Sequence, residues 1–198
     1  MKFKLTPKQK IDLIEDADFI SKETFTDVYY DTCDYKLSLN DTWLRSRNED
    51  FLLKVPIQAK GCDLLKAQKN TPKKEIQDVI EIKKALGLKN PDVSKNFRDD
   101  LNLAGYLPLY KYQNIREKYQ YNQFIIDLDR ATWNNNIFEI CEIEILVESE
   151  QKIPQALDQI KNFAIDKNLT IAPVEARLIE IIKIQNPDHY QKLKAKLF

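Results

Sequence analysis

The stretch IFEICEIEILV, residues 137–147, decides the fold. Its polar and apolar side chains alternate, as they do in a β-strand, in which successive side chains point to opposite faces. Glu142 and Glu144 share one face with Phe138 and Ile140, and the opposite face is apolar. Because like charges two residues apart repel each other, this strand predicts a group of opposite charge close to its carboxylates.

The same alternation recurs in other stretches that we predict to be strands. The same-face bases are Arg45, Arg47, Lys54 and Arg116, and the same-face acids are Asp127, Asp129, Glu142 and Glu144. Exposure to water would explain each charged face taken alone. Taken together, the paired carboxylates favour a hard cation and the arginines favour phosphate. The pattern therefore predicts a site for metal and polyphosphate, which a barrel of antiparallel strands would enclose in one polar interior.

Helices and strands follow from the apolar periodicity of the remaining chain. The predicted helices are 6–19, 76–86, 153–167, 175–184 and 187–197. The predicted strands are 26–31, 42–47, 51–55, 106–119, 122–129 and 137–147, with a polar, lysine-rich hairpin loop at 58–71. Helices lie between and after antiparallel hairpins and do not alternate with every strand, so the class α+β is favoured.

Composition limits the classes of function. The chain has 198 residues, of which 43% are hydrophobic, which is enough for a core and argues against disorder. Lys+Arg and Asp+Glu both number 31, so we expect no nucleic-acid or membrane partner. Its 3 glycines form no P-loop or Rossmann motif, and its 3 widely spaced cysteines fit a reducing compartment. No signal peptide or membrane span is visible, so we expect a cytoplasmic monomer.

Five motifs, taken in order, make the chain resemble the CYTH family, the triphosphate tunnel metalloenzymes. They are FTDVYYDT (25–32), TWLRSR (42–47), LLK (52–54), IDLD (126–129) and CEIE (141–144). The stretch NPDHYQKL (186–193), with Trp43 before the two arginines, is most similar to the thiamine triphosphatases within this family. The likeness covers nearly the whole chain and implies a single domain over residues 1–198.

The resemblance implies a closed or nearly closed eight-stranded antiparallel β-barrel with flanking helices, through which a small-molecule triphosphate threads. The implied substrate-binding residues are Lys2, Trp43, Arg45, Arg47, Lys54, Arg116 and Arg177. The implied metal ligands are Asp127, Glu142, Glu144 and Glu75, and the implied cofactor is Mg²⁺, with Mn²⁺ as the alternative. Lys2 and Tyr29 match catalytic residues that handle protons, and Trp43 matches an aromatic residue that stacks on thiamine, whose thiazolium suits an indole face. We interpret Asp129 as a strand-end or turn acid and His189 as a surface residue.

One part of the family pattern is missing. The family's first strand reads Glu-x-Glu-x-Lys, whereas here Met1 stands directly before Lys2, so we expect a truncated first strand. Either the sequence begins late in its gene or the protein is a natural divergent form, and both interpretations stay open. The implied function is metal-dependent hydrolysis of thiamine triphosphate to thiamine diphosphate and phosphate, a step of thiamine metabolism. The alternatives are an inorganic triphosphatase of the same fold, a more distant CYTH-type adenylate cyclase, and a binder of phosphorylated thiamine or polyphosphate that does not hydrolyse it.

Overall fold

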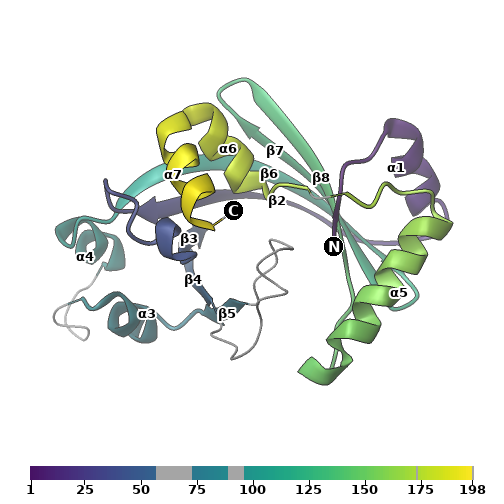
Figure 1. Cartoon of the computed structure of the whole chain (residues 1–198), viewed down its shortest axis with the longest axis horizontal. Helices are drawn as coiled ribbons and strands as arrows, with labels where there is room; N and C mark the ends of the chain where they lie inside the picture. The colour runs from purple at the N-terminus through teal and green to yellow at the C-terminus, as the bar shows by residue number, and fades with distance from the viewer. Residues whose placement is uncertain (57–72, 89–95, 173, 198) are drawn as a thin grey trace. The chain divides into compact units, whose positions relative to one another are not determined.

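The structure is a computed structural model that describes residues 1–56, 73–88, 96–172 and 174–197. The hairpin loop expected at 58–71 lies outside these residues. The chain divides into two compact units, each assembled from segments that are far apart in the sequence (Figure 1). Unit 1 consists of residues 1–25 and 113–177, and unit 2 consists of residues 26–112 and 178–198.

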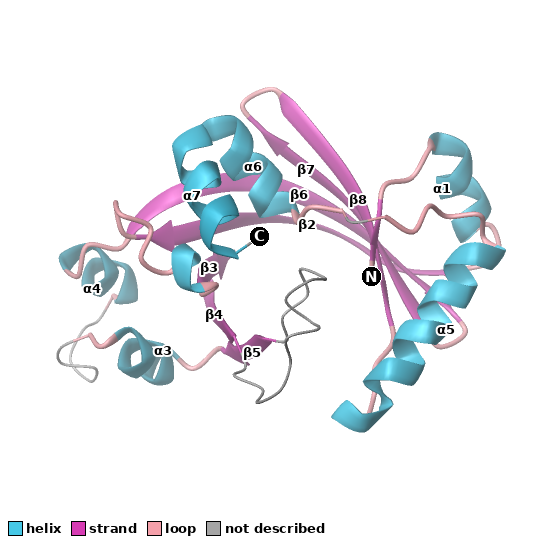
Figure 2. Cartoon of the chain, in the orientation of Figure 1, coloured by secondary structure: helices cyan, strands magenta, loops and turns pink. Residues whose placement is uncertain are grey.

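Eight strands and six α-helices lie in the described residues, and Figure 2 distinguishes them by colour. The strands are β1 (Lys2–Phe3), β2 (Asp18–Asp31), β3 (Trp43–Arg47), β4 (Asp50–Pro56), β5 (Lys73–Ile76), β6 (Leu107–Tyr121), β7 (Phe124–Trp133) and β8 (Asn136–Glu144). The α-helices are α1 (Pro7–Ile14), α3 (Val79–Leu86), α4 (Phe97–Leu103), α5 (Ile153–Asp166), α6 (Arg177–Gln185) and α7 (Pro187–Leu197), and the short 3₁₀ helices are η1 (Ser38–Asn40) and η2 (Glu150–Lys152). None of the helices in this described part is long and apolar enough to cross a membrane.

The strands form one sheet in the order β1-β8-β7-β6-β2-β3-β4-β5. The pairs β1–β8, β2–β3, β3–β4, β4–β5, β6–β7 and β7–β8 are antiparallel. This confirms the α+β class and the eight-stranded antiparallel sheet. Closure into a barrel is not confirmed, since β1 and β5 end the sheet and do not pair with each other within the described residues. With 2 residues in β1 and 4 in β5, each edge strand offers few backbone hydrogen bonds to a further neighbour.

The core of unit 1 lies between the sheet and the helices α1 and α5. Phe124 of β7 stacks on Phe163 of α5 with ring centroids 4.3 Å apart, and Leu13 of α1 and Ile143 of β8 are fully buried in the same core. These apolar residues occupy the sheet face opposite to the charged side chains of β7 and β8.

The first helix is shorter than the sequence predicts. It begins as expected, because Thr6 accepts a hydrogen bond from the Gln9 backbone N–H while the Gln9 side chain accepts one from Thr6. It ends at Ile14 instead of residue 19, because the chain from Asp18 onward forms β2. Strand pairing therefore overrides the helical pattern in this segment.

In unit 2, the helices α3 and α4 share an apolar core with β3, β4 and β5. The helix expected over 76–86 begins later, because Ile76 is the last residue of β5 and Asp78 caps α3. The helix ends as expected at Gly87, whose φ of 67° is the left-handed conformation that glycine adopts readily. The helix α4, which the sequence analysis did not predict, follows its cap residue Asn96.

Candidate functional site

One sheet face of unit 1 carries a group of polar and charged side chains, here named the Asp129 cluster. Its members are Asn114, Arg116 and Lys118 on β6, Asp127 and Asp129 on β7, Glu142 on β8, Lys2 on β1 and Arg177 at the start of α6. The register explains their common face. Arg116 lies opposite Asp129, and Asp127 lies between Lys118 of β6 and Glu142 of β8. Residues from four strands thus meet on the face that alternation predicted for charge.

Arg116 lies at the centre of this cluster. Its Nε and Nη2 donate to the two oxygens of Asp129 at 2.7 and 2.6 Å, and its Nη1 lies 2.5 Å from Asp127. Glu142 is 3.6 Å away. Burial works to lower the pKa of Arg116, but the hydrogen bond and charge of Asp129, with the charges of Asp127 and Glu142, outweigh it and raise the pKa. The guanidinium is therefore a permanent cation close to three carboxylates.

Asp129 lies within β7 and is buried, which corrects its interpretation as a strand-end acid. It accepts hydrogen bonds from Asn114 at 2.9 Å, from Arg116 and from Arg177. Burial alone would raise the pKa of Asp129, but the hydrogen bond from Arg116 and the charges of both arginines lower it below its ordinary value. Asp129 is thus an ionised counter-ion that fixes two arginines.

Two acids of the cluster fit a hard cation. Asp127 and Glu142 face each other across β7 and β8, and Asp127 Oδ1 is buried, accepts no hydrogen bond and lies 3.2 Å from Lys118 Nζ. Glu144, the next same-face residue of β8, is exposed. In the described part of the chain no group of three or more His, Cys, Asp or Glu side chains forms a metal-binding arrangement. Mg²⁺ commonly takes one or two carboxylates and completes its shell with water and phosphate, so Asp127 and Glu142 suit it.

The first strand brings Lys2 to the same face. Lys2 lies opposite Glu142 in the pairing of β1 with β8, and the amino group of Met1 donates to the Ile143 carbonyl at 2.5 Å. Lys2 therefore stands on the same sheet face as Glu142, and its role in proton transfer stays a prediction.

A second charged face lies in unit 2 and is named the Asp27 cluster. Its members are Asp27 and Tyr29 on β2, Arg45 and Arg47 on β3, Lys54 on β4 and Glu75 on β5. The cross-strand pairs are Asp27–Arg47, Tyr29–Arg45, Trp43–Lys54 and Lys54–Glu75. Glu75, expected as a metal ligand, forms an ion pair of 2.6 Å with Lys54. The three predicted bases of this unit therefore share one face.

Asp27 is the member of this cluster that the sequence analysis did not identify. It is fully buried, and Arg47 donates to its two oxygens at 2.8 and 2.9 Å. Arg45 Nε lies 3.8 Å from the same carboxylate. The sequence contains one sign that Asp27 belongs to this face, because it lies two residues before Tyr29 on the same strand. Alternation alone does not show that the Asp27 side chain is buried. Asp27 therefore holds Arg47 through a forked pair of hydrogen bonds and lies near the charge of Arg45.

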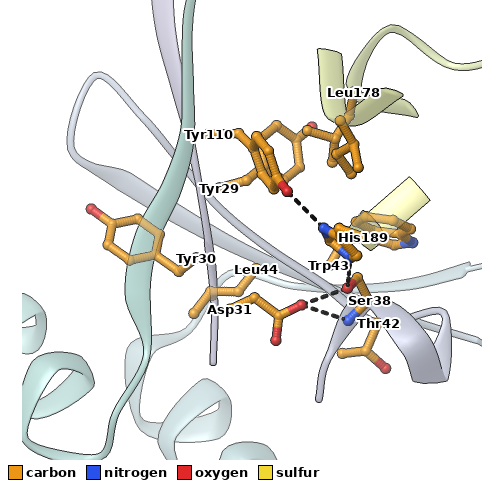
Figure 3. Close-up of a pocket in the computed structure, with 11 residues that line it drawn as sticks. Tyr29, Tyr30, Asp31, Ser38, Thr42, Trp43, Leu44, Tyr110, Leu178 and His189 are labelled. Carbon is orange, nitrogen blue, oxygen red and sulfur yellow. Dashed lines mark hydrogen bonds between the residues drawn. The ribbon is translucent and has the colours of Figure 1, made fainter. Parts of the chain in front are cut away.

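A small pocket in unit 2 contains Trp43 and Tyr29, together with Tyr110 and His189 (Figure 3). The indole Nε1 of Trp43 donates to Asp41 at 3.1 Å, which fixes the ring. The free space in the pocket is about 10 Å³, close to what one water molecule needs. A thiazolium ring does not fit inside this space as it stands. Such a ring could stack on Trp43 only from the exposed side of the indole, or after the pocket rearranges.

His189 is buried in this pocket, which corrects its interpretation as a surface residue. Its Nε2 lies 2.8 Å from the Ser38 hydroxyl and its Nδ1 lies 2.7 Å from the Tyr110 hydroxyl, as the dashed lines of Figure 3 show. Its ring stacks on Tyr35 with centroids 3.7 Å apart. Burial lowers the pKa of His189 to about 4, so the imidazole is neutral at physiological pH.

The comparison to known protein families identifies the family of the chain. The model of the CYTH domain matches residues 1–172, and the chain belongs to the CYTH domain family. This confirms the family that the five motifs resemble. The narrower likeness to the thiamine triphosphatases is not confirmed, and no curated protein matches the chain significantly.

Several solved structures share the fold. The PH1819 protein from Pyrococcus horikoshii OT3 is 22% identical with a TM-score of 0.65, over 93% of this chain and 97% of that chain. A candidate adenylate cyclase from Vibrio parahaemolyticus is 15% identical with a TM-score of 0.55, over 89% and 91%. A candidate adenylyl cyclase from Hippeastrum, described as having a dominant triphosphatase activity, is 16% identical with a TM-score of 0.54, over 92% and 93%. At these identities the likeness shows the fold alone.

Proposed function

We propose that this protein hydrolyses the terminal phosphoanhydride bond of a triphosphate with the help of a divalent cation, Mg²⁺ or Mn²⁺. The Asp129 cluster carries the proposal. Arg116 and Arg177 suit phosphate, and they share the cluster with Asp127 and Glu142, which suit a hard cation. Membership of the CYTH family and the triphosphatase activity of the Hippeastrum protein support it.

Phosphoryl transfer depends mainly on neutralising charge and on holding the reacting groups in line. In this proposal Arg116 and Arg177 donate to nonbridging phosphate oxygens, and Asp129 keeps both guanidinium groups oriented. Further phosphate-binding bases are Arg45, Arg47 and Lys54 of the Asp27 cluster. Arginines that are already held in place lose little conformational freedom when phosphate binds.

Asp127 and Glu142 would hold the cation, with Glu144 as a further candidate ligand. When bound, the cation withdraws negative charge from the phosphate oxygens and so favours attack by water. Lys2, opposite Glu142 on β1, and Tyr29, opposite Arg45 on β2, are the proposed proton-handling residues.

We propose thiamine triphosphate as the substrate, because Trp43 lies on the strand face of Arg45 and an indole attracts a cationic ring. Inorganic triphosphate is the second candidate. It is favoured by the pocket beside Trp43, whose free space of about 10 Å³ is too small for a ring, and by the hydrogen bond that ties the indole to Asp41. Closure of the sheet into a triphosphate tunnel, a cytoplasmic location and action as a single-domain monomer belong to the same proposal.

The test measures phosphate release from thiamine triphosphate, tripolyphosphate and ATP, with Mg²⁺, with Mn²⁺ and without metal. We expect metal-dependent release from a triphosphate, and its loss in Arg116→Gln and in Asp127→Asn. Arg130→Gln is the matched control, because Arg130 is an exposed residue of β7 that takes no part in the Asp129 cluster. Pyrophosphate and a cyclic nucleotide formed from ATP would indicate a cyclase, and binding of tripolyphosphate without phosphate release would indicate a non-hydrolysing binder; either result would contradict the proposal.

A further inference from the structure

Arg116 competes with any cation for the carboxylates that the proposed function assigns to the metal. Its guanidinium lies 2.5 Å from Asp127 and 3.6 Å from Glu142 while it is hydrogen-bonded to Asp129. The side chain of Asp127 is 2% exposed and that of Arg116 is 18% exposed. Ion pairs with so little exposure are weakly screened by salt. A divalent cation that binds Asp127 Oδ2 takes the place of this guanidinium contact, and one that binds Oδ1 lies beside the charge of Arg116 and that of Lys118, whose Nζ is 3.2 Å from Oδ1.

The contacts of Arg116 differ in how firmly they hold it. Asp129 takes Nε and Nη2 together in a forked pair, which is a strong and directional arrangement. Asp127 is reached through Nη1, and the 3.6 Å separation from Glu142 is longer than a hydrogen bond. The guanidinium can give up Asp127 and Glu142 without leaving Asp129.

We propose that Arg116 is an exchangeable counter-ion that neutralises Asp127 and Glu142 until a divalent cation binds there. It then stays on Asp129, and its released Nη1 is free to donate to phosphate. This inference rests on the proposed function, because it takes Asp127 and Glu142 as the metal ligands. It adds a coupling, in which cation binding releases a phosphate-binding group and each ligand strengthens the binding of the other. Such coupling is reciprocal and is typically about 5–150-fold.

The charges around Arg116 determine the effect of removing it. The nearby acids are Asp127, Asp129 and Glu142, and the bases that contact them are Arg116, Lys118 and Arg177. These six charges balance. Arg116→Gln leaves one net negative charge among them and keeps an amide donor for Asp129. The variant should therefore bind a divalent cation more tightly, although it loses a base that the proposed function needs.

The experiment uses Mn²⁺ alone, with free Mn²⁺ followed by its electron paramagnetic resonance signal. We expect Arg116→Gln to bind Mn²⁺ about tenfold more tightly than the unmodified protein, which lies within the usual range of coupling. Arg130→Gln changes the net charge equally on an exposed part of the same unit and should leave the affinity unchanged. Asp127→Asn in the Arg116→Gln background should remove the gain.

The outcomes separate this inference from the proposed function. Mn²⁺ binding that is unchanged or weaker in Arg116→Gln would overturn the inference and leave the proposed function standing. No Mn²⁺ binding in any variant would overturn the metal site itself, and the inference with it. If Arg116→Gln unfolds in metal-free buffer, recovery of its folded circular dichroism spectrum on adding Mn²⁺ supports the inference, and failure to recover overturns it.

Discussion

The only histidine of the chain links folding to pH. Ser38 donates its hydroxyl proton to Asp31 at 2.6 Å, so the Ser38 oxygen accepts the Nε2 proton of His189. Burial raises the pKa of Tyr110, which therefore keeps its proton and donates it to Nδ1 at 2.7 Å. The neutral imidazole satisfies both neighbours. If the ring took up a second proton at Nδ1, this N–H would face the hydroxyl proton of Tyr110, and neither group could accept the other's hydrogen bond.

The size of the effect follows from the pKa. Burial lowers the pKa of His189 from 6.5 to about 4, with Lys192 adding to the shift and Asp31 opposing it. In the unfolded chain the pKa returns to 6.5, so between pH 6.5 and about 4 the unfolded state binds more protons than the folded state. The free energy of unfolding therefore falls as the pH falls through this window, and the histidine has no effect above it. A difference of about 2.5 pH units corresponds to a loss of about 3 kcal/mol at the acid end.

Two measurements check this prediction. The imidazole proton signal in a ¹H NMR titration belongs to His189 without ambiguity, because the chain has 1 histidine, and it gives the pKa of the folded state directly. Urea unfolding at about pH 7.5 and about pH 4.5 should show a loss of about 2–3 kcal/mol that is absent from His189→Gln. The variant is less stable at both pH values, so the pH dependence is the informative quantity.

The reasoning would be refuted by a pKa near 6.5 in the folded protein, because the imidazole would then be solvated. It would also be refuted if His189→Gln lost as much stability on acidification as the unmodified protein. In that case groups other than His189 would account for the whole effect.

Three further predictions concern the two clusters. Trp43→Ala should lower kcat/KM for thiamine triphosphate by up to about thirtyfold and leave tripolyphosphate hydrolysis nearly unchanged, because stacking on a cationic ring is worth up to about 2 kcal/mol; an equal loss on both substrates would return Trp43 to a packing role. Glu142→Gln combined with Glu144→Gln should abolish Mn²⁺ binding and metal-dependent phosphate release while the metal-free melting temperature stays within a few degrees, and a large drop in that temperature would mean that the pair is structural. Asp129→Asn should lower the free energy of unfolding by about 3–5 kcal/mol in urea, because it leaves the buried charge of Arg116 poorly compensated; a loss below about 1 kcal/mol, typical of an exposed pair, would contradict the role of Asp129 as a counter-ion.

The faces of the strands could be predicted from the sequence, because alternation is a property of the local chain. Arg45 and Arg47 lie on one face of β3, as the pattern indicated, and Leu44 and Ser46 on the opposite face are buried. The bounds of α7 also agree, since Pro187 suits the first turn of a helix and the side chain of Asn186 accepts a hydrogen bond from the first-turn backbone at 3.0 Å. In both cases the structure is determined by contacts between residues that are close together in the sequence.

The burial of polar residues could not be predicted, because it depends on partners that are distant in the sequence. Arg177, which donates a hydrogen bond to the buried Asp129, is 48 residues away from it. Ser38 and His189 are separated by 151 residues. A lone histidine in a polar helix and an acid near the expected end of a strand carry no local sign of such partners, so exposure was the default interpretation for both.

The structure also separates two kinds of acid that alternation treats alike. Each unit contains one buried aspartate between two arginines, and these groups are Asp27 with Arg45 and Arg47, and Asp129 with Arg116 and Arg177. Each of these aspartates orients bases, and the remaining donors of those bases suit phosphate oxygens. Asp127 and Glu142 differ, because Asp127 keeps a buried oxygen without a hydrogen bond and Glu142 lies beyond hydrogen-bonding distance of Arg116. Among these four acids, a forked arginine pair therefore marks Asp27 and Asp129, which orient arginines for phosphate. Asp127 and Glu142, which take no such pair, suit a cation.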